Sequence, residues 1–297
     1  FNVFAERPLV VEAFNEDARR LGVCMYGHTD DERLNWRYGA FLLQSVTLNG
    51  QYVGDSSQGS INGRLAGSPW YDECSGGRGY FHWAVSGMAA KPDGDRTYPD
   101  TNGNAARFRT RPEARSTNRW VDTSAIAGAD WYEILGFESI INVGPLQVVG
   151  EYQRTWLQRD NSVAVNSDLD FQGAYCYVSY FLTGEHMPYD RKSGTLGRVH
   201  PFENFFLVPT CDGCRGTGWG AWQVAARYSY LDLSDGNVQG GEEQNVTVGL
   251  NWYWTAYSKV QFNAIYGKID DHRVVAPNPG FTGGDFWILG TRFMADF

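Results

Sequence analysis

The chain has few of the features that mark helical or enzymatic proteins. It holds no run of about 18 apolar residues, so no transmembrane helix is expected. Helical periodicity is confined to residues 5–20, where one or two turns are expected. The Gly-rich segment 216–220 lacks the lysine and the helix of a phosphate-binding loop, and Ser and His have no recognisable catalytic spacing. We therefore expect no enzyme and no cofactor.

Cysteine is scarce, and its spacing predicts no metal site. Cys211 and Cys214 form a CDGC motif, which is half of a metal site or a small loop disulfide. Cys24 and Cys176 fall in expected strands, and Cys74 falls in an expected loop. The net charge of -9 argues against a nucleic-acid partner.

What the chain has instead is long segments in which apolar and polar residues alternate. In residues 245–254, five apolar side chains share one face, while Asn, Thr, Gly and Tyr share the other. Segments 33–44, 80–88, 221–230 and 258–267 follow the same pattern. Because these segments are longer than the usual strand of about 5–6 residues, they have the length needed to cross a bilayer.

Tryptophans lie near the ends of the expected strands, as in the interfacial girdles of membrane barrels: Trp36, Trp131, Trp156, Trp222, Trp252, Trp254 and Trp287. A soluble β-sandwich would need no such belt. We therefore predict an all-β fold, a transmembrane antiparallel β-barrel. A soluble Trp-rich β protein that binds carbohydrate is the alternative, with aromatics clustered in its loops.

About eleven long strands are expected: 22–29, 33–44, 78–90, 105–112, 131–143, 146–158, 169–183, 219–232, 244–254, 258–268 and 285–297. A final strand ending in Phe297 is typical of bacterial outer-membrane barrels. If that strand runs inward, the short turns 30–32, 144–145 and 255–257 are periplasmic. Segments 45–77, 113–130, 159–168, 233–243 and 269–284 become extracellular loops. Segments 91–104 and 184–218 become periplasmic, with 200–208 a further short strand or a docked flap.

Barrels of this class have an even number of strands, so we expect that strands are missing before Phe1. Several motifs resemble the phosphate-selective porin O and P family in a consistent order along nearly the whole chain. They are Glu6-Arg7, Ala13-Phe14, Arg20-Leu21-Gly22, residues 107–113, Val121-Asp122-Thr123, Gly150-Glu151-Tyr152, residues 182–185, 225–229, 231–233 and 249–253.

The resemblance implies an outer-membrane porin of 16 strands that forms a homotrimer and passes small anions such as phosphate. It implies one barrel domain over 1–297, with 1–21 as the end of a third loop folded into the pore and 22–297 as strands. Arg7, Arg19 and Arg20 would then line the constriction, or pair with Glu12, Glu16 and Asp17. The early part of that loop is not in this sequence, and the family does not fix the solute.

The stretch ARFRTRP, residues 106–112, places an arginine at every second position. In a barrel strand, Phe108 would face lipid, while Arg107, Arg109 and Arg111 would face the lumen. By the same alternation, Arg33, Arg37, Arg227 and Arg292 point inward. Guanidinium groups bind phosphate-like oxygens, so this row predicts an anion pathway.

Two other interpretations remain open. The arginines could pair with lumenal carboxylates such as Glu133, Glu151 and Asp296, which would leave a general diffusion porin for small polar solutes. Alternatively, a plugged structural barrel could anchor an envelope partner through 184–218. His28 and His82 are expected to be ordinary polar positions.

Overall fold

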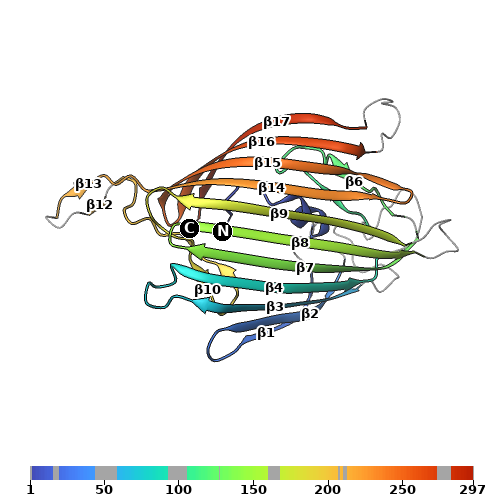
Figure 1. Cartoon of the computed structure of the whole chain (residues 1–297), viewed down its shortest axis with the longest axis horizontal. Coiled ribbons are helices and arrows are strands. Elements are labelled where there is room, and N and C mark those ends of the chain that lie inside the picture. Colours follow the sequence, from blue (N-terminus) through green and yellow to red (C-terminus); the bar gives the residue numbers. More distant parts are fainter. Residues whose placement is uncertain are drawn as a thin grey trace.

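The computed structural model describes residues 2–15, 20–43, 59–92, 106–126, 128–159, 168–206, 208–209, 213–272 and 282–296. Eleven strands in this part of the chain form one antiparallel sheet (Figure 1). In sheet order they are β1 (Gly22–His28), β2 (Leu34–Leu42), β3 (Gly59–Tyr71), β4 (Gly79–Ala90), β7 (Ala129–Val143), β8 (Leu146–Arg159), β9 (Leu169–Phe181), β14 (Ala221–Asp235), β15 (Val238–Thr255), β16 (Ser258–His272) and β17 (Gly284–Ala295).

The predicted all-β antiparallel architecture is confirmed. The sheet is an open barrel wall, since β1 and β17 are its two edges and neither pairs with the other. The helix α1 (Leu9–Phe14) lies on the inner side of this wall, against β8, β9 and β14. No helix among the described residues is long and apolar enough to cross a membrane.

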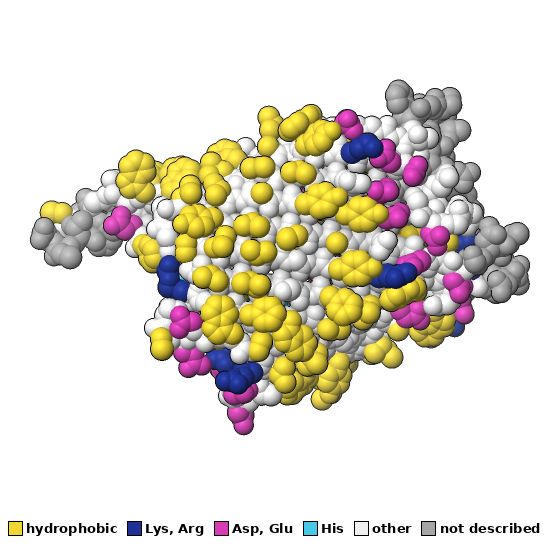
Figure 2. Space-filling view, viewed as in Figure 1, with side chains coloured by type: hydrophobic (Ala, Val, Ile, Leu, Met, Phe, Trp, Pro, Cys, Tyr) yellow, Lys and Arg dark blue, Asp and Glu magenta, His cyan; other side chains and the backbone are white. Residues whose placement is uncertain are grey.

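The alternation of side chains across the wall is as predicted. In β14, Gln223, Ala225, Arg227 and Ser229 are buried on the inner face, while Val224, Ala226 and Tyr228 are exposed on the outer face. Figure 2 shows the result, a broad band of hydrophobic side chains over the strands with charged side chains toward the two ends. The exposed outer face is therefore apolar, which suits contact with lipid.

The seven expected girdle tryptophans lie near strand ends, and each is exposed or half-buried. Trp222 and Trp252 stack with ring centroids 5.0 Å apart, and Trp252 meets Trp254 at 5.4 Å. At the other end of the sheet, Trp287 packs on Tyr266. These rings border the apolar band at both ends, where amphipathic side chains are favoured.

One expected wall strand is wrong and one is missing. Residues 105–112 are not a strand of the wall, because only β5 (Arg109–Thr110) is extended there, and it pairs with β6 (Val121–Asp122) in a separate small sheet. The strand β3 lies in the segment that we expected to be a loop. Because one predicted strand is absent from the wall and one unpredicted strand is present, the number of wall strands is still eleven. The strands between β2 and β7 are, however, assigned differently from the prediction.

This shift reverses the direction of β4, so Lys91 and Pro92, which follow that strand, lie at the opposite end from the one predicted for 91–104. The rest of that expected segment is outside the described residues. The short turns 30–32, 144–145 and 256–257 do lie at one end, joined there by 72–78; we call this the short-turn end. The last residues of β2, β4 and β8 and the first residues of β3, β7 and β9 lie at the opposite end. The expected loop 233–243 shrinks to a two-residue connection, because β14 and β15 extend to Asp235 and from Val238.

The expected excursion 184–218 has two parts. Residues 184–200, which we call the docked segment, carry β10 (Tyr189–Asp190) and β11 (Thr195–Leu196). The second part carries β12 (Val208–Pro209) and β13 (Arg215–Gly216), which project beyond the short-turn end (Figure 1). Among the described residues of the expected element at 200–208, Val208 is extended in a paired strand and Phe205 forms an isolated bridge to Gly218.

The inner side of the wall carries two apolar clusters. The first joins α1 and the 106–126 segment to the wall and includes Leu9, Phe14, Phe108, Val121 and Leu231. The second joins Phe4 and the docked segment to the short-turn half and includes Met187 and Tyr253. The lumen of this wall is thus partly filled by these inserted segments.

Candidate functional site

The N-terminal residues 2–15, which we call the lumen segment, run along the inner face of the wall. The segment turns into helix α1 after Pro8, whose ψ of 154° is still extended, and the helix ends at Asn15. Proline suits a helix start because its missing N–H would lack a partner there in any case. Leu9, Val10, Ala13 and Phe14 are buried, so one face of this short helix packs against the wall.

Polar side chains of four wall strands hold the backbone of the lumen segment. Asn251 Nδ2 donates to the carbonyl of Val3 at 2.7 Å, and Gln261 Nε2 donates to the same carbonyl at 3.0 Å. Further bonds to carbonyls come from Arg227 to Glu6, from Arg292 to Ala5 and from Lys259 to Asn2. The wall therefore satisfies the unpaired carbonyls of a non-helical stretch, as buried backbone requires.

Two inward-facing glycines make room for this segment. A Cβ at Gly173 would lie 2.9 Å from the Cβ of Val10, and one at Gly249 would lie 3.3 Å from a ring carbon of Phe4. Any larger side chain at Gly173 would push the helix off the wall, because real Cβ contacts are not that short.

The arginine row lies inside the lumen rather than along a wall strand. Arg107 pairs with Asp122, and Arg111 Nη1 lies 2.9 Å from Glu12 Oε1 on α1. Arg109 is half-buried on β5, opposite Asp122. Phe108 does not face lipid, because it is buried among Phe14, Tyr132 and Phe171. The alternation at 106–112 thus comes from packing one side on the apolar cluster at α1.

A buried ion pair joins the same segment to the wall. Glu113 Oε2 lies 2.7 Å from Arg227 Nη2 and accepts a hydrogen bond from Thr247 Oγ1 at 2.7 Å. The Arg227 guanidinium also lies 4.3 Å from the centre of the Phe4 ring. Arg227 thus holds both inserted segments against β14.

The other predicted arginines are scattered. Arg292 points inward and binds Ala5, as above, while Arg37 Nη2 donates to Ser193 of the docked segment at 3.2 Å. Arg33 is exposed in the turn before β2, 3.7 Å from Asp31. Arg20 is half-buried before β1, and Arg19 lies outside the described residues. These residues do not form one continuous row.

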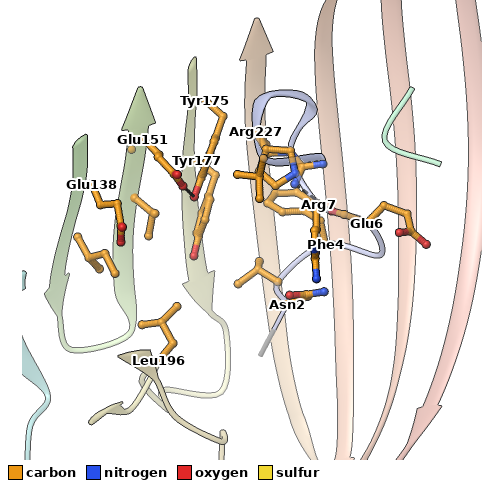
Figure 3. Close-up of a pocket in the computed structure, with 16 residues that line it drawn as sticks. Asn2, Phe4, Glu6, Arg7, Glu138, Glu151, Tyr175, Tyr177, Leu196 and Arg227 are labelled. Carbon is orange, nitrogen blue, oxygen red and sulfur yellow. Dashed lines mark hydrogen bonds between the residues drawn. The ribbon is translucent and has the colours of Figure 1, made fainter. Parts of the chain in front are cut away.

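Arg7 differs from the rest because it is exposed on the lumen segment and makes no hydrogen bond or ion pair within the described part of the chain. It borders a cavity of about 280 Å³ between the lumen segment and the wall (Figure 3). Glu138 and Glu151 lie on the opposite side, from β7 and β8. The rest of the lining is mainly apolar and aromatic: Phe4, Val11, Ile140, Val149, Tyr175, Tyr177 and Leu196.

A cluster of side chains around Glu138, which we call the acidic cluster, was missed from the sequence. Arg64 binds both carboxylate oxygens of Glu138, at 2.9 and 2.8 Å. His82 is fully buried beside them and lies 2.7 Å from the hydroxyl of Tyr189. Alternation could have placed His82 and Glu138 inward, but Arg64 belongs to β3, which reads as a loop.

Of the expected lumenal carboxylates, Glu151 does face inward. Glu133 does not, because the buried positions of β7 at that end are Tyr132 and Ile134. Glu133 accepts a hydrogen bond from Gln158 on the outer face instead. Asp296 pairs with Arg198 at the short-turn end.

The docked segment borders the cavity through Leu196 and is held to the wall by backbone contacts. The hydroxyl of Tyr80 donates to the carbonyl of Met187 at 3.0 Å, and Arg78 donates to the carbonyl of Gly184 at 2.8 Å. Burial raises the pKa of Tyr189 to about 12. Burial, together with the nearby Arg78, lowers the pKa of His186 below its usual value. No group of metal-ligating side chains occurs in the described ranges. The second cysteine of CDGC, Cys214, is exposed, and Cys211 is outside those ranges.

Comparison with known proteins supports a porin. The sequence profile of the family described as phosphate-selective porin O and P matches residues 2–297. An uncharacterized protein of Caulobacter vibrioides is 24% identical over 306 residues, which cover 99% of this chain and 54% of that protein. Porin O of Pseudomonas aeruginosa is 24% identical over 170 residues, 54% of this chain and 35% of that protein. This chain spans about half the length of the first of these relatives. The match over nearly every residue shows that the chain belongs to the phosphate-selective porin O and P family.

Proposed function

We propose that this chain forms wall and constriction of an outer-membrane porin through which small polar solutes diffuse passively. The observation that carries the proposal is the cavity between the lumen segment and the wall, which carries charged side chains on two sides and lies inside a sheet whose outer face is apolar. Porin family membership implies a channel rather than an enzyme. A constriction of this kind restricts the size of the solute without holding it tightly.

Ion pairing favours a general diffusion pore over an arginine ladder. Arg107, Arg111 and Arg227 each pair with a carboxylate, so their charge is largely neutralised within the lumen. An anion would have to compete with Asp122, Glu12 and Glu113 for them. We therefore expect these arginines to position the inserted segments more than to conduct.

Selectivity for small anions such as phosphate is the second candidate, and Arg7 supports it. Its guanidinium faces the cavity unpaired within the described residues, and it could bind a phosphate-like oxygen on two nitrogens. Family membership also favours it. The homotrimer, the lipid surroundings and the 16-strand closure belong to this proposal and rest on the family.

The full-length protein in a planar lipid bilayer tests the proposal. We expect step-like conductance with a reversal potential near zero across a salt gradient. An anion-selective current that phosphate reduces, and that Arg7→Gln weakens, would favour the anion candidate. The triple variant R107A/R109A/R111A tests whether the arginine row contributes to anion selectivity.

Arg33→Gln is the matched control, because Arg33 is an exposed turn residue that is not among the residues lining the cavity. A protein that inserts into the bilayer but conducts no ions would contradict the porin proposal and favour an anchoring barrel.

A further inference from the structure

The cavity has two walls of opposite character. Glu138 and Glu151 are directly opposite each other in the pairing of β7 with β8, so two carboxyl groups stand side by side. Arg7 and Arg227 lie across the cavity from them (Figure 3). Like charges on opposite residues of a strand pair are destabilising, so this arrangement calls for an explanation.

The two carboxyl groups differ in their partners. Arg64 neutralises Glu138 through two hydrogen bonds. Glu151 accepts a hydrogen bond from Tyr175 at 2.9 Å and another from Gln153, but no cation pairs with it in the described part of the chain. The acidic wall therefore keeps one carboxyl group for a partner, and an ammonium group near it would stabilise the ionised form.

The basic wall is asymmetric in the same way. Arg227 is used by Glu113, by the carbonyl of Glu6 and by the ring of Phe4. Arg7 has no such partners among the described residues. The carboxylate of Glu6, next to it, points away from Glu138 and Glu151 in Figure 3. Apart from Glu6, one cation and one carboxyl group of the described lining thus remain, on facing walls.

Between these two groups the lining is apolar. Phe4 and Val11 come from the lumen segment, Ile140 and Val149 from the wall, and Leu196 from the docked segment. A volume of about 280 Å³ suits one small solute. These apolar side chains, which we call the apolar floor, would contact a short hydrocarbon side chain of the solute.

We propose that this cavity is a passage site for small zwitterions of the amino-acid class. The ammonium group would meet Glu151, the carboxylate would meet Arg7, and the side chain would lie on the apolar floor. A zwitterion can contact both walls at once, whereas a free anion or a free cation is attracted by one wall and repelled by the other. This inference rests on the proposed porin function and names its solute. Weak contacts on both walls let a solute enter and leave.

Osmotic swelling of liposomes that contain the full-length protein tests this. Leucine is the zwitterionic solute, and a neutral polyol of similar size is the reference. We expect leucine to enter faster than the polyol. Glu151→Gln and Arg7→Gln should each lower the leucine-to-polyol rate ratio by about two- to fivefold, the loss expected for one solvated ion pair. Arg7→Lys should retain most of the ratio.

Glu133→Gln is the matched control for Glu151→Gln, because it removes the same charge from the neighbouring strand β7 but on the outer face. The polyol rate reports whether each variant forms an intact pore. A wild-type ratio near one, or a ratio that neither variant changes, overturns the inference while leaving the porin intact. Liposomes that swell with neither solute overturn the porin proposal itself.

Discussion

At the scale of single residues, the buried ion pair of Glu113 and Arg227 is the one whose loss we expect to destabilise the protein most. Their side chains are 0% and 2% exposed. Glu113 also adopts a φ of 55°, in the left-handed region that most residues avoid. A backbone held there by surrounding structure places the carboxylate on Arg227 and Thr247, so the pair fixes where the 106–126 segment sits.

Glu113→Leu should destabilise the protein strongly, because it leaves the Arg227 guanidinium buried without its counter-charge. Breaking one side of such a pair costs about 3–5 kcal/mol. The double variant Glu113→Leu with Arg227→Met should recover much of that loss, since neither charge remains. Equilibrium unfolding in urea, followed by tryptophan fluorescence in detergent, measures both.

Glu203→Gln serves as the control, because that glutamate is exposed in the segment after the docked segment. A double variant that is as unstable as the single one would mean that packing around Glu113, rather than its charge, holds the segment.

At the scale of elements, the docked segment is a candidate for pH-dependent opening. His186 has a lowered pKa in the docked state because of burial and the charge of Arg78. The open segment would have the ordinary histidine pKa of about 6.5 and would bind more protons just below it. Docking is therefore fully favoured above that pH and weakens as the pH falls.

Amide hydrogen exchange over 184–200 should be faster at about pH 5.5 than at about pH 7.5, after correction for intrinsic exchange. His186→Gln should abolish the difference, because glutamine does not titrate. A pH dependence that persists in this variant would assign the opening to another group.

Most wall strands could be predicted from alternation, because lipid on one side and inserted segments on the other impose a period of two. The strand β3 could not, because its Gly, Ser and Asn residues and Pro69 read as a loop. Its register is irregular between Gly67 and Trp70, around Pro69, a position where proline is tolerated in a strand. Residues 106–112 show the reverse error. Their alternation is real, but periodicity reports half-burial and does not tell a wall from an insert.

The site was predictable only in part for the same reason. Inward positions such as Arg227 and Arg292 follow from strand parity. Their partners do not, because Glu113 and the carbonyls of the lumen segment come from far away in sequence. The acidic cluster includes side chains from β3 and from the docked segment. No local sequence pattern predicted the position of either element.

At the scale of the whole molecule, the apolar outer band ends in an aromatic cluster at the short-turn end. The carbonyl of Trp219 accepts hydrogen bonds from the indoles of Trp222 and Trp252, at 3.2 and 2.8 Å. Trp219 itself is 79% exposed. Tryptophan favours the interface between lipid and water, so we expect this ring to lie in the headgroup region.

Lipids brominated near the headgroup should quench Trp219 in reconstituted protein. Trp219→Phe should lower the quenched share of the total tryptophan fluorescence. Trp120→Phe should lower it much less, because Trp120 packs on Phe286, whose alternation places it on the inner face. Equal effects from both variants would mean that the segment carrying Trp219 stays out of the bilayer.

The many carbonyl contacts of the lumen segment have an electrical consequence. A constriction tied to the wall by Asn251, Gln261, Arg227 and Arg292 cannot swing between wide and narrow positions on the timescale of ion passage. The width of the constriction in such a pore is constant. Its open current would be steady, with little flicker, and any noise would have to come from solutes that pause inside.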